Sequence, residues 1–166
     1  MRFSVLALAL ACALAGAGIA AAQSTSVPFG ALTHDTTAPV EVTAESLTVD
    51  QADGTAVFSG NVVISQGAMR ITAAEVRVTY AEGNSDGRVE RLEATGGVVL
   101  LSSAEKAEAR EAVYTIDSGV IVLTGTVMLS QGRNSISAGK MTLNLKSGTA
   151  VLDGGVRTVL QPRSNP

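Results

Sequence analysis

The sequence is poor in the residues that build disulfides, metal sites and catalytic centres. Its 166 residues include one cysteine, one histidine and no tryptophan. Cys12 lies in an N-terminal apolar stretch, so neither disulfides nor thiolate metal sites are expected in the rest of the chain. The single histidine, His34, excludes a histidine-based catalytic triad or a multi-histidine metal site within one chain. No cofactor, metal or catalytic residue is predicted, and a hydrolytic enzyme is disfavoured.

Charge is also sparse. Charged residues make up 16% of the chain and hydrophobic residues 46%, which indicates a globular protein rather than a disordered one. The net charge is −3, and it becomes −4 once Arg2 leaves with the predicted signal peptide. This balance argues against nucleic-acid binding, which requires clustered cations. The apolar residues are mainly valine, isoleucine, leucine and alanine, followed by threonine and 17 glycines, and this composition favours short strands joined by tight turns.

The N-terminus has the organisation of a secretory signal. Residues 1–22 combine a positive start, an apolar stretch at residues 5–14 and the small-residue cleavage site Ala20-Ala21-Ala22. The apolar stretch is too short for a transmembrane helix, and Cys12 inside it is interpreted as a small apolar residue rather than a lipidation site. We therefore expect export to the periplasm and a mature chain that begins at Gln23.

The remaining chain divides into three parts and contains an internal repeat. We expect a flexible leader over residues 23–38, a single β-domain over residues 39–160 and a loose tail over residues 161–166. Gly-x-Val recurs at Gly60, Gly96, Gly125 and Gly154. Two units match further, because the stretch from Phe58 to Val78 aligns with the stretch from Leu123 to Leu143 at a constant offset of 65 residues.

Each unit alternates between apolar and polar residues with a period of two. In the first unit Phe58, Val62 and Ile64 share one face, while Ser59 and Asn61 point the other way. Gly60 within the apolar face indicates a bend or a close approach of another backbone. Residues 103–112 contain strong helix formers, but their position between strands favours a turn that leads into a strand. The sequence thus predicts an all-β, antiparallel fold.

Other candidate sites have ordinary explanations. Glu41, Glu45, Asp50 and Asp53 lie close in sequence, and alternation makes them solubilising charges rather than a catalytic carboxylate pair. The segment 83–87 resembles part of a calcium loop but lacks the required carboxylate spacing, which favours a hairpin turn. The apolar face remains, either as ordinary core or as a lipid-holding interior. Scarce aromatics and many small inward residues favour the lipid-holding interior.

The order of the motifs resembles a known family. Val42-x-Ala44-Glu45-x-Leu47, then Phe58-x-Gly60-x-Val62, and later Leu92 to Val98, are similar to the organic-solvent-tolerance-protein-like (OstA-like) domain of lipopolysaccharide transport. The resemblance implies a twisted, slightly open antiparallel β-jellyroll, built from repeated strand pairs, with a groove for lipid A acyl chains. It implies a non-enzymatic bridge between the two membranes. The implied partners are lipopolysaccharide, the inner-membrane transport protein C, the outer-membrane translocon protein D and further copies of the chain, joined head to tail.

Two sets of site residues follow. The predicted groove residues are Leu47, Val49, Phe58, Val62, Ile64, Ile71, Val76, Val78, Leu92, Val98, Leu100, Tyr114, Ile116, Leu123, Val127, Leu129, Ile136, Met141 and Leu143. The predicted edge-strand assembly residues are Val40, Val42, Ala44, Val151, Leu152, Val156 and Val159. The alternatives are a self-assembling structural β-solenoid, for which the uneven repeat intervals are awkward, and a periplasmic hydrolase.

Overall fold

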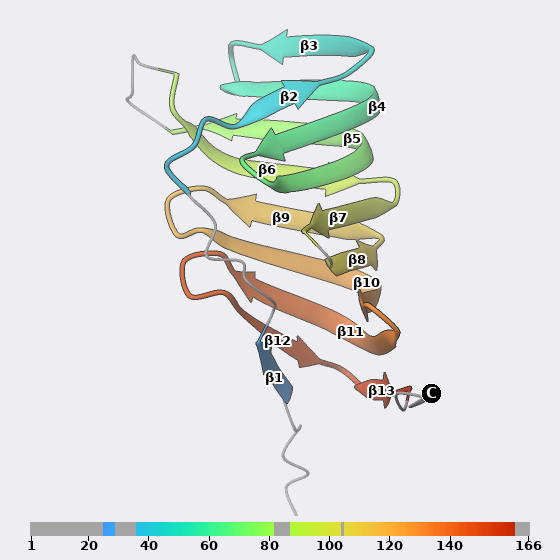
Figure 1. Cartoon of the computed structure of the whole chain (residues 1–166). Coiled ribbons are helices and arrows are strands. Elements are labelled where there is room, and N and C mark those ends of the chain that lie inside the picture. The colour runs from blue at the N-terminus through green and yellow to red at the C-terminus, as the bar shows by residue number, and fades with distance from the viewer. Residues whose placement is uncertain (1–24, 29–35, 82–86, 104, 162–166) are drawn as a thin grey trace, which may run out of the picture.

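The computed structural model describes residues 25–28, 36–81, 87–103 and 105–161. Every regular element in these ranges is a β-strand (Figure 1), and they contain no helix that is long and apolar enough to cross a membrane. The predicted signal peptide, His34 and the segment 82–86 lie outside the described residues. The strands are β1 Thr25–Pro28, β2 Glu41–Thr43, β3 Ser46–Asp50, β4 Thr55–Gln66, β5 Met69–Tyr80, β6 Val89–Thr95, β7 Val98–Ser102, β8 Glu105–Ala109, β9 Glu111–Thr115, β10 Val120–Gln131, β11 Asn134–Asn144, β12 Thr149–Asp153 and β13 Arg157–Val159.

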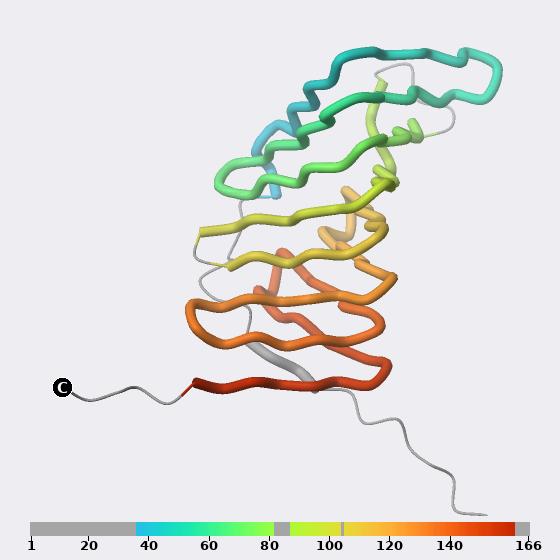
Figure 2. Tube along the Cα trace, turned by 90° about the vertical axis from the view of Figure 1, so that its right-hand side faces the viewer, coloured from blue at the N-terminus to red at the C-terminus, as the bar shows by residue number. Residues whose placement is uncertain are grey.

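The strands form a stack that runs from β2 and β3 at one end to β12 and β13 at the other (Figures 1 and 2). Four long strands each bend and contribute to two layers. β4, for example, pairs with β3 through residues 55–59 and with β2 through residues 63–65. Layer I contains, in order, β3, the first half of β4, the second half of β5, β6, β9, the first half of β10, the second half of β11, β12 and β1. Layer II contains β2, the other halves of β4, β5, β10 and β11, with β7 and β8 between them, and β13.

The bends in β4 and β10 are two-residue bulges. The β4–β5 register shifts between Ser59 and Val62, so Gly60 and Asn61 together oppose one residue of β5. Gly60 has φ +83° and Asn61 has φ +45°, a left-handed conformation that glycine adopts at little cost. Gly125, at the equivalent position of β10, has φ +82°. We call this side of the stack the corner. The bend predicted at the repeat glycines is confirmed.

The opposite side is where the two layers end in turns, and we call it the seam. It consists of the ends of layer I at residues 50–55, 115–120 and 144–149, and of layer II at residues 66–69, 102–105 and 131–134. Between corner and seam the inward side chains of both layers meet in one hydrophobic core. The alternation predicted the inward side correctly. The predicted groove residues that are buried in this core are Val62, Ile64, Ile71, Val76, Val78, Leu92, Val98, Leu100, Tyr114, Leu123, Val127, Leu129, Ile136, Met141 and Leu143.

Two segments with little sequence periodicity are strands. Residues 103–112, which contain strong helix formers, form β8 and the start of β9, so the strand interpretation is confirmed. The prediction of a flexible leader over residues 23–38 is wrong at residues 25–28. These four residues form β1, because the exposed edge of β12 offers unpaired backbone groups to the N-terminal segment.

Candidate functional site

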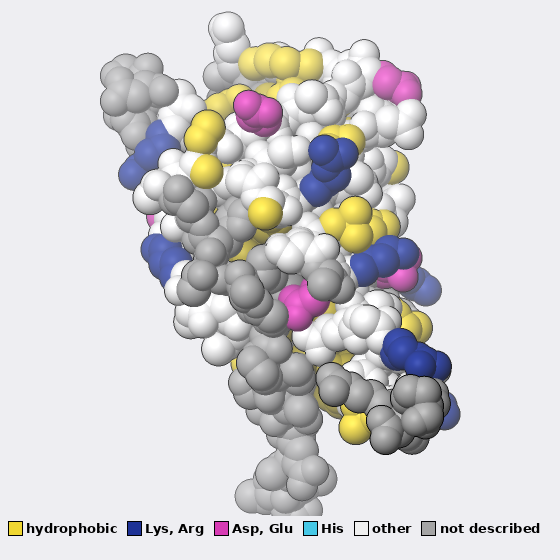
Figure 3. Space-filling view, in the orientation of Figure 1, with side chains coloured by type: hydrophobic (Ala, Val, Ile, Leu, Met, Phe, Trp, Pro, Cys, Tyr) yellow, Lys and Arg dark blue, Asp and Glu magenta, His cyan; other side chains and the backbone are white. Residues whose placement is uncertain are grey.

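The interior opens at the end of the stack formed by β2 and β3. Leu47 lies opposite Phe58, and Val49 lies opposite Ala56, so both point to the inner side of layer I. Leu47 is nevertheless 53% exposed and Val49 57% exposed, because no strand covers β3 on its far side among the described residues. Figure 3 shows apolar side chains exposed at this end. We call this end of the interior the mouth.

An apolar pocket of about 230 Å³ adjoins the mouth. It lies between β2 of layer II and the strands β4, β5 and β6 of layer I. Phe58 lies in it half-buried, so an aromatic ring is available to a ligand that enters. The pocket is lined by Val40, Val42, Phe58, Val78, Tyr80, Val89 and Leu92.

The interior is filled at the other end of the stack. Leu123, Val127 and Leu129 of β10 are fully buried, as are Met141 and Leu143 of β11. These side chains belong to the second repeat unit and occupy the positions that Phe58, Val62, Ile64, Val76 and Val78 hold in the first unit. The predicted groove is therefore accessible at the mouth and close-packed below it.

A buried polar network ties the two layers together across the interior. The hydroxyl of Tyr114, in layer I, donates a hydrogen bond of 2.7 Å to Oε1 of Gln66, in layer II. Nε2 of Gln66 donates to the carbonyl oxygens of Thr36 at 3.2 Å and Ala38 at 3.0 Å. We call these contacts the seam latch. They fix residues 36–38 against the open side of the stack.

Burial raises the pKa of the Tyr114 hydroxyl above its usual value, and the hydrogen bond to Gln66 opposes this shift. The hydroxyl is therefore protonated at neutral pH and can donate the hydrogen bond to Gln66. Gln66 and Tyr114 are both almost fully buried, so the latch satisfies polar groups that would otherwise be costly to enclose.

A second polar group lies at the equivalent position of the second repeat unit. Nε2 of Gln131, which corresponds to Gln66, donates a hydrogen bond of 2.8 Å to Oε1 of Glu105. Oε2 of Glu105 and the hydroxyl of Ser102 are buried and have no hydrogen-bond partner among the described residues. Burial raises the pKa of Glu105 above its ordinary value of 4.5, although the bond to Gln131 opposes this.

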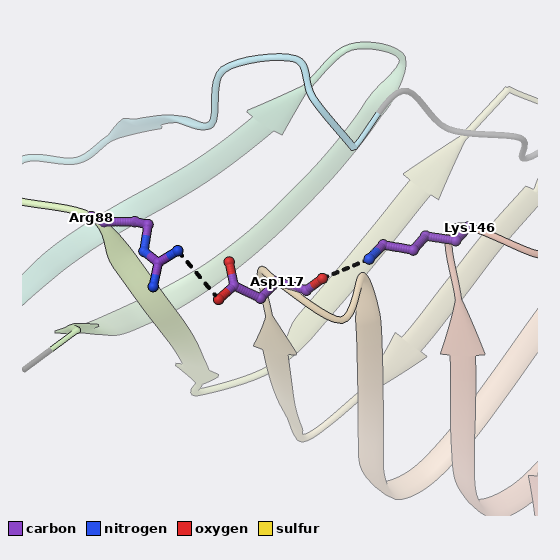
Figure 4. A network of polar contacts seen from close by, with 3 residues as sticks. All are labelled: Arg88, Asp117 and Lys146. Atoms are coloured by element: carbon purple, nitrogen blue, oxygen red, sulfur yellow. Dashed lines mark hydrogen bonds and ion pairs between the residues drawn. The ribbon is translucent and has the colours of Figure 1, made fainter.

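Charged side chains bridge successive turns on the layer I side of the seam. Arg88 lies 3.7 Å from Oδ2 of Asp117, and Nζ of Lys146 donates to the backbone carbonyl of Asp117 at 2.6 Å (Figure 4). Both ends of the ion pair are well exposed, so it contributes little to stability. The contacts connect the turns before β6, after β9 and after β11.

The acidic residues near the N-terminal end have structural roles. Oδ1 of Asp50 accepts hydrogen bonds from the backbone N–H groups of Ala52 and Asp53 and closes the β3–β4 turn. Glu45 accepts a hydrogen bond from Asn61 at the corner. The described residues contain no group of three or more His, Cys, Asp or Glu that could hold a metal ion. These positions match the interpretation of Glu41, Glu45, Asp50 and Asp53 as surface charges.

The predicted edge residues fall in different surroundings. Val40 and Val42 line the pocket, and Ala44 is exposed beside the corner. Leu152 is fully buried, and Val151 and Val156 are half-buried, whereas Val159 on β13 is exposed. Ile116, a predicted groove residue, is half-buried against the core. Among the predicted edge residues, Val40, Val42, Leu152 and Val156 therefore pack into or against the core, whereas Ala44 and Val159 do not.

Several site residues were not predicted. Tyr80 and Val89 line the pocket, and Tyr80 could have been found by extending the alternation Val76-x-Val78 by one step. Gln66 was visible as a repeat position shared with Gln131, but its partners are distant in sequence. Nothing in the sequence pairs Tyr114 with Gln66.

Comparison with known proteins gives consistent matches. Residues 41–149 match the family model described as "LptA/(LptD N-terminal domain) LPS transport protein". The lipopolysaccharide export system protein LptA of Escherichia coli K12 is 30% identical over 98% of this chain and 90% of its own length. The protein of the same name from Haemophilus influenzae is 27% identical over 80% of this chain and 82% of its own.

A solved structure shows the same fold. The crystal structure of LptH from Pseudomonas aeruginosa, described as the LptA-homologous periplasmic component of a lipopolysaccharide transport device, superposes with a TM-score of 0.67. The match covers 78% of this chain and 99% of LptH, at 20% identity. Its similarity extends the agreement from sequence to architecture, and the twisted antiparallel jellyroll expected from the motifs is confirmed. The chain belongs to the family of LptA and the LptD N-terminal domain, the LPS transport proteins.

Proposed function

We propose that this chain is a non-enzymatic periplasmic carrier that holds the acyl chains of lipopolysaccharide between its two layers. Relatives with this fold are named for lipopolysaccharide export and transport. The predicted signal peptide supports export across the inner membrane. The carrier function also agrees with the scarcity of catalytic residue types in the sequence.

The observation that carries the proposal is the uncovered apolar inner face at the mouth. Leu47 and Val49 point inward and yet remain more than half exposed, beside a pocket lined by apolar side chains. A hydrocarbon chain lying there would remove both surfaces from water. Each buried methylene group contributes about 0.8 kcal/mol, so acyl chains bind without specific polar contacts.

The pocket holds only the first part of such a ligand. Its volume of about 230 Å³ lies below the roughly 300–1,000 Å³ of most small-molecule sites. A lipid with several acyl chains therefore requires the two layers to separate further along the seam. The seam latch between Tyr114 and Gln66 is the contact that such a separation would break.

We propose that the bridge forms by head-to-tail strand pairing. β12 runs from the seam to the corner, and β3 runs from the corner to the seam. The same opposition holds for β13 and β2 in layer II. The end strands β2–β3 of one copy, placed below β12–β13 of another, would continue both antiparallel ladders with their corners aligned. The membrane-anchored protein C and the outer-membrane protein D are the proposed partners at the two ends of the bridge.

Photo-crosslinking tests the lipid site. Photoreactive residues at Val49 and Phe58 should capture lipopolysaccharide most strongly, with less capture at Val62 and least at Val127, because the lipid enters at the mouth. Residues at Asn61 and Thr126, which are exposed on the corner, serve as controls. Equal capture at the mouth and the corner would contradict the proposal.

Sedimentation tests the bridge. The purified mature chain should form larger species as its concentration rises, since a head-to-tail contact does not close on itself. Deleting residues 157–166 removes β13, whose side chains are exposed, and leaves β12 in place with its buried residues Ala150 and Leu152. This variant should stay folded and associate less. A mature chain that remains monomeric at every concentration, alone and with its partners, would rule out the bridge.

A further inference from the structure

The N-terminal strand β1 covers one of the two strand edges at the β12–β13 end of the stack. Residues 25–28 pair antiparallel with residues 149–152 of β12, and this makes β1 the last strand of layer I (Figure 1). β13, the last strand of layer II, has no such cover among the described residues, and its three side chains are exposed. At this end of the stack, the edge of layer I is thus covered by β1 and the edge of layer II is open.

β1 occupies the position that a second copy would use in the proposed bridge. It runs from the corner side to the seam side, because Thr25 lies opposite Leu152 and Pro28 lies opposite Thr149. The incoming β3 of a second copy would have the same direction on the same edge. Each edge has one row of unpaired N–H and C=O groups, so β1 and an incoming β3 exclude each other.

The attachment of β1 favours pairing within the molecule. Thr36, which follows Pro28 by eight residues, is held at the seam by Gln66. Eight residues span at most about 27 Å. Thr36 lies against Gly119 at the start of β10, and β1 is three strand spacings from β10, about 14 Å. The tether is long enough to reach the edge and short enough to give a high effective concentration.

We propose that β1 is an intramolecular cap that limits head-to-tail assembly, and that a second copy must displace it from β12. The inference rests on the proposed bridge. Assembly would begin on the open edge of β13 and be completed when β3 of the second copy replaces β1. The partner is another copy of this chain, recognised through its two short end strands, β2 and β3.

A deletion tests the cap. A mature chain lacking residues 25–28 should associate more tightly than the intact mature chain in sedimentation experiments. A cap that is closed nine-tenths of the time weakens association about tenfold, so removing it should restore that factor. Unchanged or weaker association of the deletion variant would overturn the cap and make β1 part of the assembly contact.

A disulfide lock tests the same idea in the opposite direction. Positions 26 and 151 lie directly opposite each other, where Cα atoms are about 4.5–5.5 Å apart, within disulfide range. The expected mature chain has no other cysteine, and Val151 alternates with the buried Ala150 and Leu152. The oxidised S26C/V151C variant should associate less than either single variant, and reduction should restore association. Association that is unaffected by oxidation would also overturn the cap.

Lipid capture separates this inference from the carrier function. Crosslinking of lipopolysaccharide at Phe58 should be the same in the intact, deleted and locked chains, since β1 lies at the far end of the stack from the mouth. If capture fails in all three while the deletion still strengthens association, the carrier proposal fails and the cap stands. If every variant stays monomeric, the cap is overturned together with the bridge.

Discussion

The hairpins β4–β5 and β10–β11 are built from closely matched residues and lie in different surroundings. Both bend at a glycine with a positive φ, and both turn at the seam after a glutamine. Leu123 is fully buried in the second hairpin, whereas the equivalent Phe58 is half-buried beside the pocket. Both layers continue through several strands beyond β10, whereas only the short strands β2 and β3 lie beyond β4 among the described residues. Val62 and Val76 of the first hairpin are buried like their equivalents. The number of strands beyond a hairpin, and not its own residues, therefore decides how far an inward side chain such as Phe58 is exposed.

The largest expected effect comes from truncating the equivalent inward side chains. Leu123→Ala should lower the free energy of unfolding by about 3 kcal/mol, because it leaves a cavity in a close-packed region. Phe58→Ala should cost roughly 1 kcal/mol, because its ring is only half-buried, but it should weaken lipopolysaccharide capture. Urea unfolding and crosslinking at Val49 measure the two effects. Equal losses of stability would mean that the two hairpins are packed alike.

The corner glycines, in contrast, should behave alike in the two hairpins. A Cβ added at Gly125 would lie 2.8 Å from Cβ of Arg110, whose backbone is held between Gly97 and Thr124. Gly125→Ala should therefore cost about 2–3 kcal/mol, including about 1–2 kcal/mol for the left-handed backbone. A Cβ added at Gly60 would lie 2.9 Å from Cβ of Glu45, whose backbone N–H donates to the carbonyl oxygen of Gly60, so Gly60→Ala should cost a similar amount.

Gly132→Ala provides the control for the corner variants. Gly132 also has a positive φ, +57°, but a Cβ there would meet nothing within 4 Å. Its loss of stability measures the backbone effect alone, about 1–2 kcal/mol. If Gly125→Ala is no more destabilising than Gly132→Ala in urea unfolding, the close approach of Arg110 to Gly125 contributes nothing to the loss of stability.

Breaking the seam latch should lower the free energy of unfolding less than the corner variants do. It should instead loosen the seam. Tyr114→Phe removes the hydroxyl that donates to Gln66 and leaves the buried Oε1 without that bond, at a cost of about 1–2 kcal/mol. Residues 36–38 should then exchange their amide hydrogens faster. Tyr80→Phe, in the pocket wall, is the matched control. Identical exchange in the two variants would show that the latch does not hold this segment.

The smallest effect is expected at Glu105, the hydrogen-bond partner of Gln131 in the second repeat unit. Burial raises the pKa of Glu105 in the folded state, so its contribution to stability is fully present below pH 4.5 and is lost as pH rises through the raised pKa. Glu105→Gln keeps an acceptor for Gln131 and removes this loss. The variant should unfold at a slightly higher temperature than the wild type at pH 7, and the difference should vanish at low pH. A difference that is independent of pH would contradict the assignment.

The sequence predicted the inner face well because a period of two fixes the side on which each residue lies. The inward direction of Val62, Ile71 and Leu143 could be predicted without knowing which strands lie beside them. The exposure of Leu47 could not be predicted, since it has the same alternating pattern as buried residues and differs only in the absence of a further strand. β1 was missed for a related reason. Four residues without alternation gain their structure by pairing with β12, more than 120 residues away.

The constant offset of 65 residues between the two hairpins has a consequence for length. In layer I, β4 and β10 are four strand spacings apart, through β5, β6 and β9, which corresponds to about 19 Å. A duplicated or deleted unit of this size would keep each corner above a corner and each turn at the seam. The length of the stack can therefore change in whole steps of strand spacing while its cross-section stays the same. The number of strands sets the distance that a single copy spans.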